Sequence, residues 1–139
     1  MVVRILKSAY LELIRHAESG YPNEVCGVLI GKDGEITDCK QCRNLSEERA
    51  HDRYELDPTS FYEADDWARK KRLEILGIYH SHPDHPSVPS EFDRSRAWPE
   101  WIYIILSIKN GKYNDGRAWL LDDSILNFKE KGIDLIDEK

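Results

Sequence analysis

The apolar positions near the start of the chain predict a helix followed by a β-hairpin. In residues 7–20, KSAYLELIRHAESG, four apolar side chains recur at the i, i+3, i+4, i+7 spacing of one helix face: Tyr10, Leu13, Ile14 and Ala17. Gly20 is placed to end that helix. Residues 25–30 form a near-continuous apolar run that is typical of a buried strand. Asp33-Gly34 then favours a tight turn into a second strand that runs to residue 42.

The rest of the chain carries further strand and helix signals. Strand patterns occur at residues 53–58, 74–82, 101–108 and 116–123. Asp57 is placed to cap a helix that begins at Pro58 and runs to residue 73, and a short helix ends before Pro99. The tail from residue 125 is polar and its pattern is ambiguous. This order predicts an α/β or α+β domain with one mixed β-sheet flanked by helices.

Length and charge narrow the classes of function. The 139 residues suit one domain over residues 1–139. The net charge of −6 argues against nucleic acid or a membrane surface as a partner, because both need a basic face. The longest apolar run, residues 101–106, is far shorter than the roughly 20 residues of a membrane span. Arg4 and Lys7 interrupt the first residues, which therefore lack a signal-peptide core, and we expect a cytoplasmic protein.

Three cysteines are too few for a disulfide framework, although Cys39 and Cys42 form a C-x-x-C pair. A redox pair would open a helix, whereas this segment has the pattern of a strand that runs into a loop. A structural zinc site would need a second pair of ligands, and the sequence has none. We therefore expect two reduced cysteines on a strand, and Cys26 as a small core residue.

A cluster of histidines follows the strand at residues 74–82. Side chains alternate between the two faces of a strand, so His80 and His82 project from the same face, which is the geometry that a metal ion requires. Pro83 is expected to end the strand. A catalytic zinc site takes three protein ligands, and the candidates for the third are Asp84, His85, Glu91 and Asp93. Of these, Asp93 lies far enough along the chain for the loop to fold back over the strand end.

Two further residues allow more than one interpretation. Ser90 and Asp93, in the sequence SEFD, fit a helix capping box, in which both residues have a structural role alone. Glu24 lies at the start of the first buried strand, where a partly desolvated carboxylate suits proton transfer. On spacing alone, however, Glu24 also fits an ordinary solvated residue at the start of a strand.

Taken in order, these residues resemble the JAMM (MPN+, Mov34/PAD-1) family of zinc metalloproteases. The matching elements are Glu24 ahead of Cys-Gly-x-Leu-x-Gly, then His80-Ser81-His82-Pro83, then Ser90-x-x-Asp93. The resemblance covers residues 7–122 and is specific, because separated elements follow one another at the family's spacing. It implies a cytidine-deaminase-like α/β fold, with Zn²⁺ held by His80, His82 and Asp93 together with one water. It also implies Glu24 as general acid/base and Ser90 as a hydrogen-bond donor to the oxyanion, and it makes His85 a non-ligand.

The resemblance is to the short prokaryotic members of the family, and it implies a substrate class. Such enzymes process ubiquitin-like or sulfur-carrier proteins at their C-terminal Gly-Gly. We therefore expect a zinc metallopeptidase that hydrolyses a peptide or isopeptide bond after that tail. An extended tail could add as a strand beside an exposed sheet edge near the site.

Three other interpretations compete with this one. A nucleobase deaminase would need H-x-E and P-C-x-x-C, and no cysteine follows Asp57, so that class is close to excluded. A non-catalytic MPN-type scaffold or interaction domain would be favoured by loss of a motif residue, but all of them are present. A purely structural metal would be indicated by a fourth protein ligand such as His85.

Overall fold

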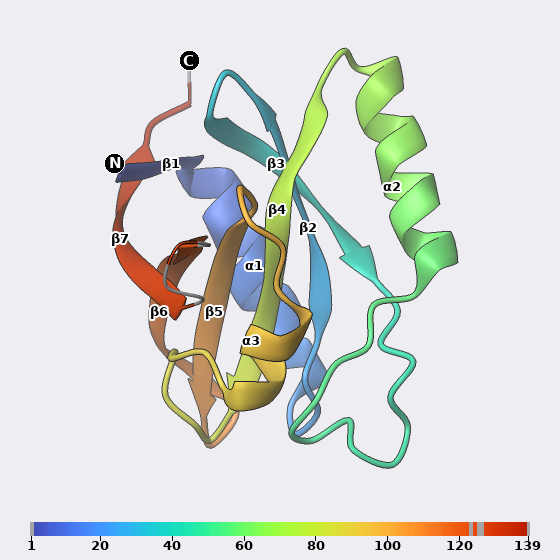
Figure 1. Cartoon of the computed structure of the whole chain (residues 1–139), viewed down its shortest axis with the longest axis vertical. Helices are drawn as coiled ribbons and strands as arrows, with labels where there is room; N and C mark the ends of the chain where they lie inside the picture. The colour runs from blue at the N-terminus through green and yellow to red at the C-terminus, as the bar shows by residue number, and fades with distance from the viewer. Residues whose placement is uncertain (1, 123, 125–126, 139) are drawn as a thin grey trace.

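The computed structural model describes residues 2–122, 124 and 127–138 of the chain (Figure 1). Its elements are β1 (Val2–Leu6), α1 (Lys7–Gly20), β2 (Cys26–Lys32), β3 (Glu35–Cys42), α2 (Pro58–Lys70), β4 (Glu74–Pro83), α3 (Glu91–Arg96), β5 (Ile102–Lys109), β6 (Lys112–Asp122) and β7 (Asn127–Ile136). In the described part of the chain, no helix is long and apolar enough to cross a membrane.

The strands form one mixed sheet, which closes on itself in the order β1-β3-β2-β4-β5-β6-β7. The β1/β3, β1/β7 and β4/β5 pairs are parallel, and the other pairs are antiparallel. A mixed sheet with helices was the predicted α/β architecture and is confirmed. The closure was not predicted, because it depends on parallel pairing between the two ends of the chain, which lie side by side (Figure 1).

The two faces of the sheet are covered by different helices. Helix α1 packs against β1 and β3–β7, so it lies within the curve of the sheet, and α2 packs on the other face against β2, β3 and β4 (Figure 1). Tyr79 belongs to the apolar cluster around α1, whereas its neighbour Ile78 belongs to the cluster around α2. Strand alternation therefore places His80 and His82 on the same face as Ile78 and α2.

Several local predictions are confirmed by the structure. Helix α1 spans residues 7–20, and the turn at Asp33-Gly34 has positive φ at both residues, as a tight hairpin turn requires. The Asp57 side chain accepts a hydrogen bond from the Thr59 backbone N–H and caps α2. Strand β4 ends at Pro83, and α3 ends before Pro99.

Other predictions are wrong in detail. The expected strand at residues 53–58 is reduced to one isolated bridge between Asn44 and Leu56. Helix α2 ends at Lys70 rather than residue 73, because Arg72 takes a left-handed φ of 60° and the Leu73 backbone N–H turns back to the Ala68 carbonyl. The ambiguous polar tail forms β7, whose hydrogen bonds to β1 and β6 stabilise a strand that few apolar residues mark.

The three cysteines are free thiols of the sheet, as predicted. Cys39 packs against the α1 cluster, whereas Cys42 and Cys26 belong to the α2 cluster. Because Cys39 and Cys42 face opposite sides of β3, they cannot share a metal ion or act as a redox pair. Burial raises the pKa of Cys39 to about 12 and that of Cys42 to about 11, which keeps both thiols protonated and unreactive.

Candidate metal centre

The end of β4 delivers two buried imidazoles to one face of the sheet. His80 is paired in register with Cys26 on β2 and Ile105 on β5, and His82 is paired with Ser107 on β5. The two histidines are 1% and 7% exposed. Ser81 points to the other face, where its hydroxyl accepts a hydrogen bond from the Val25 backbone N–H at 2.9 Å. The predicted alternation is therefore confirmed.

Asp93 reaches both histidines from the first turn of α3. Its Oδ2 lies 3.0 Å from His82 Nε2, and its Oδ1 lies 3.7 Å from His80 Nε2. The same carboxylate completes a capping box, because Oδ2 accepts from the Ser90 backbone N–H at 2.9 Å and Ser90 Oγ accepts from the Asp93 backbone N–H at 3.0 Å. The capping box is thus present, and the loop does fold back over the strand end.

Glu24 lies beside the other ring nitrogen of His80. Its Oε1 is 3.5 Å from His80 Nδ1, and Glu24 is only 5% exposed, so the interpretation as a solvated strand-start residue is wrong. Its backbone is covered by the loop after β3, where the Ala50 carbonyl accepts from the Glu24 N–H and the Asn44 side chain donates to the Glu24 carbonyl. Neither Glu24 Oε1 nor His80 Nδ1 has a hydrogen-bond partner among the described residues.

The electrostatics of the group follow from these contacts. Burial acts to lower the pKa of His80, but the Asp93 and Glu24 carboxylates outweigh it, and the pKa lies above its ordinary value. Burial acts to raise the pKa of Asp93, but His80 and His82 outweigh it and hold the pKa below the ordinary range. The group therefore concentrates negative charge beside two nitrogen donors, as a cation site requires.

The donor set fits a divalent metal ion. Ligand atoms of Glu24, His80 and His82 lie within 4.8 Å of one another, and the Asp93 carboxylate faces both Nε2 atoms. Two buried polar atoms without partners, on Glu24 and His80, indicate that the site is built to take up another group. Imidazole nitrogens and carboxylate oxygens are ligands of zinc and of related transition metals.

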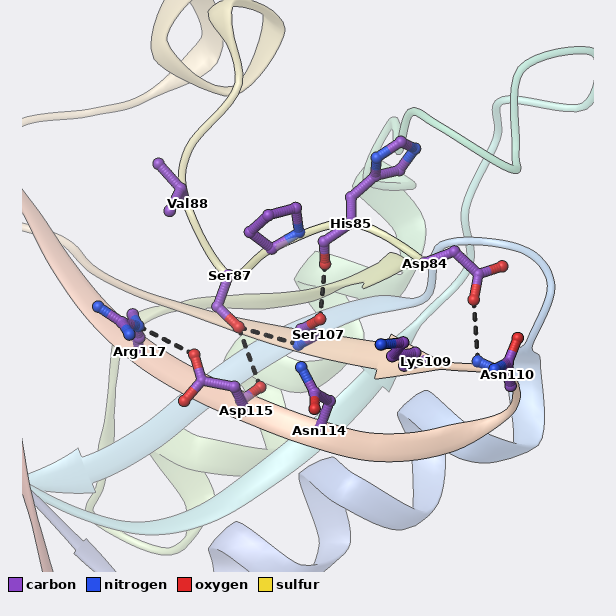
Figure 2. A pocket seen from close by; sticks show the side chains of 11 residues that line it. Asp84, His85, Ser87, Val88, Ser107, Lys109, Asn110, Asn114, Asp115 and Arg117 are labelled. Carbon is purple, nitrogen blue, oxygen red and sulfur yellow. Dashed lines mark hydrogen bonds and ion pairs between the residues drawn. The ribbon is translucent and has the colours of Figure 1, made fainter.

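The structure places the other candidate ligands elsewhere. The Asp84 carboxylate is engaged by the Tyr21 hydroxyl at 2.6 Å and the Asn110 backbone N–H at 2.9 Å. His85 is exposed and lines a cavity of about 670 Å³ that none of Glu24, His80, His82 and Asp93 lines (Figure 2). Glu91 is also exposed and bonds to Arg94. None of these three side chains joins the group at the end of β4.

Two contacts to the histidines were missed by the sequence reasoning. The Tyr54 ring stacks on His80 at 4.5 Å between centroids, and His82 Nδ1 lies 2.8 Å from the Pro86 carbonyl. Proline spacing in the loop could have suggested the second contact, but no local pattern marks Tyr54. Tyr54 also lines a mostly apolar groove of about 900 Å³, together with Leu45, Phe61, Trp98 and Trp101, so the residue that stacks on His80 forms part of the wall of this groove.

Comparison with known protein families gives one match over most of the chain. The model of prokaryotic homologs of the JAB domain matches residues 6–122. A desampylase of Pyrococcus furiosus is 32% identical over 121 residues, which cover 86% of this chain and 81% of the relative. A desampylase of Haloferax volcanii is 37% identical over 102 residues, covering 68% and 73%. A CysO-cysteine peptidase of Mycobacterium tuberculosis is 25% identical over 129 residues, covering 91% and 86%.

Solved structures show the same fold. A protein of Desulfitobacterium hafniense superimposes with a TM-score of 0.83 at 29% identity, covering 99% of this chain and 94% of that one. A JAB1/MPN domain protein of Archaeoglobus fulgidus superimposes with a TM-score of 0.59 at 17% identity, covering 94% and 97%. At that low identity the second likeness concerns the fold alone. Together these structures confirm the predicted JAMM/MPN architecture.

Proposed function

The chain belongs to the family of prokaryotic homologs of the JAB domain, and from that premise we propose that it is a zinc metallopeptidase acting after the C-terminal Gly-Gly of a ubiquitin-like or sulfur-carrier protein. The observation that carries the proposal is the buried group of Glu24, His80, His82 and Asp93 at the end of β4. The names of the relatives, desampylase and CysO-cysteine peptidase, support this substrate class. The bond cleaved is a peptide or isopeptide bond.

Three residues hold the metal in this proposal. His80 and His82 supply ring nitrogens from one strand, and Asp93 faces both Nε2 atoms from α3. Three nitrogen and oxygen ligands that leave one position open are the arrangement of catalytic zinc. When bound, zinc supplies Lewis-acid chemistry, which acidifies water and polarises the scissile carbonyl.

Glu24 moves the proton. Its Oε1 is buried beside His80 and lacks a partner in the described part of the chain, so it is available to accept a proton from the attacking water. The same oxygen then delivers that proton to the departing amine of the leaving group. A carboxylate in this position acts first as a base and then as an acid within one turnover.

Ser90 binds the developing negative charge. The residue is exposed at the N-cap of α3, and its Oγ accepts a hydrogen bond from the Asp93 backbone N–H. A hydroxyl has one proton to donate in addition to its acceptor lone pairs, so Ser90 can donate to the oxyanion while it caps the helix.

The carrier tail approaches over the face of the sheet. Strand β4 has β2 on one side and β5 on the other, so a tail cannot pair with β4 itself, and its addition beside an exposed sheet edge near the site stays a prediction. We place the extended tail in the groove that Tyr54 shares with the metal centre. Exposed Trp98 at its rim offers a flat apolar surface to a partner.

A cleavage assay tests the proposal. Purified protein is incubated with ubiquitin-like carriers that bear a C-terminal cysteine or a lysine-linked adduct after Gly-Gly, and products are identified by mass spectrometry. We expect cleavage after the second glycine, loss of cleavage with a zinc chelator, and recovery when zinc is returned. A carrier with Ala-Ala in place of Gly-Gly is the matched control. Zinc-loaded protein that leaves every carrier intact would favour the scaffold interpretation instead.

A further inference from the structure

The loop between β4 and α3 is held down by hydrogen bonds to the two neighbouring strands. Ser107 on β5 donates its hydroxyl to the His85 carbonyl at 2.6 Å, and its backbone N–H donates to Ser87 Oγ at 3.1 Å. Ser87 in turn donates its hydroxyl to the Asp115 carbonyl on β6 at 3.0 Å (Figure 2). The indole N–H of Trp119 donates to the Ser87 carbonyl at 2.9 Å. Both loop residues that flank Pro86 are therefore fixed.

The position of Ser107 follows from the register of the sheet. His82 on β4, Ser107 on β5 and Asp115 on β6 are successive cross-strand partners, so the three residues form a row on one face of the sheet. Ser107 is 3% exposed and Ser87 is 1% exposed. Along β5, Ser107 interrupts a run of buried apolar side chains. A buried hydroxyl in such a strand needs partners, and the loop beside His82 provides them.

Packing alone does not support this loop on its outer side. The cavity of about 670 Å³ lies there, between the loop and the Lys109, Asn114 and Arg117 side chains of the opposite wall (Figure 2). His85 and Val88 are exposed. Because the cavity lies against this side of the loop, the hydrogen bonds to β5 and β6 determine where the Pro86 carbonyl lies.

We propose that Ser87 and Ser107 are positioning residues that hold the Pro86 carbonyl against His82 Nδ1 and so present His82 Nε2 to the metal. A carbonyl oxygen only accepts, so the 2.8 Å contact requires a proton on Nδ1, and in the neutral ring that binds a metal ion this leaves the lone pair on Nε2. Asp93 Oδ2 already lies 3.0 Å from Nε2, so when the carbonyl moves away, the proton of the neutral ring can shift to Nε2 and be accepted there. That arrangement blocks the nitrogen that binds metal.

The two serines are expected to differ in how firmly they hold the Pro86 carbonyl in place. Ser107→Ala removes one bond, to the His85 carbonyl, and keeps the backbone N–H that reaches Ser87. Ser87→Ala removes the acceptor of that buried N–H and also the donor to the Asp115 carbonyl. Ser87→Ala should therefore displace the Pro86 carbonyl further and weaken zinc binding more than Ser107→Ala does.

The inference rests on the metal site of the proposed function, and its test does not depend on peptidase activity. Zinc affinity is measured on the full chain by competition with a chromophoric chelator, and the His82 tautomer is read from ¹⁵N chemical shifts of the metal-free protein. We expect about 10–100-fold weaker zinc binding in both variants, together with loss of the Nδ1–H tautomer of His82. Cobalt-substituted protein should also show a changed visible spectrum.

Ile108→Val is the matched control. Ile108 follows Ser107 on β5, is fully buried and belongs to the cluster around α1, so its truncation destabilises the strand without removing a bond to the loop. We expect lower thermal stability with unchanged zinc affinity and tautomer. If the serine variants behave like Ile108→Val, the positioning role is refuted.

If Ser87→Ala does not fold, the milder Ser107→Ala alone tests the positioning role. Wild-type protein that binds zinc but cleaves no carrier would refute the proposed peptidase and leave this inference standing.

Discussion

Ser90 has two roles in the structure that substitutions can separate. Its Oγ accepts the Asp93 backbone N–H at 3.0 Å as the N-cap of α3, and its exposed hydroxyl can donate to a substrate. Ser90→Ala removes both functions, and loss of the cap should cost about 1 kcal/mol of stability. For a chain of 139 residues that corresponds to a fall of about 3–4 °C in Tm. Ser90→Gly should cost only a few tenths of a kcal/mol, because glycine is tolerated at this position.

Catalysis should respond differently from stability. Removing a donor to the oxyanion lowers kcat by about 10²–10³-fold, and this loss should appear in both Ser90→Ala and Ser90→Gly. Ser90→Thr keeps a hydroxyl and a good cap, so it should retain most of the activity. The Ser90 backbone N–H, which binds Asp93 Oδ2, remains in every variant, so zinc content should stay unchanged.

The assay combines kcat on a carrier fusion, zinc content and Tm for the three variants. The reasoning is refuted if Ser90→Gly cleaves at the wild-type rate, because the hydroxyl would then have no part in the reaction. It is also refuted if activity falls in proportion to Tm across the series, because helix capping would then explain both. A large loss of zinc in Ser90→Gly would show instead that the hydroxyl supports Asp93 as a ligand.

Three further predictions follow from the geometry of the chain. His82→Ala should reduce zinc from one ion per chain to a small fraction by elemental analysis, and full retention would remove His82 from the ligand set. Glu24→Gln should bind zinc normally and lower kcat by about 10²–10⁴-fold, and a normal cleavage rate would show that Glu24 is not the base. Burial lowers the pKa of His16 from 6.5 to about 4, so the unfolded chain binds a proton that the folded chain excludes, and stability should fall as pH drops through that range. His16→Gln should flatten this part of the urea-unfolding profile, and an unchanged slope would exclude His16 as its cause.

Local patterns predicted the elements that carry the histidines. Strand β4 was foreseen because its apolar run and the following proline are properties of neighbouring residues, and the α1 face was foreseen from helical spacing. Strand β7 was not foreseen, because most of its side chains are at least partly exposed and its stability comes from pairing on both sides. Closure of the sheet depends on contacts between residues more than a hundred positions apart, which no local pattern encodes.

In the candidate site, too, some features could be predicted from local patterns and others could not. Alternation along a strand placed His80 and His82 together, and loop length brought Asp93 into reach. The burial of Glu24 could not be predicted from spacing, because it depends on the loop after β3, where Asn44 and Ala50 bind the Glu24 backbone. Tyr54 lies towards the end of that loop, so its stacking on His80 could not be predicted from spacing either.

The capping box and the metal site were competing interpretations of Ser90 and Asp93, yet the structure shows that the cap is compatible with an Asp93 carboxylate that faces both histidines. A carboxylate has about four acceptor positions, and the cap uses one of them, on Oδ2. The remaining acceptor positions, on Oδ1 and Oδ2, are directed at His80 and His82. A six-residue helix has little stability of its own, so without the cap nothing local would hold Asp93 at this angle. In the proposed site, the S-x-x-D spacing therefore serves the helix and the metal through different lone pairs of one side chain.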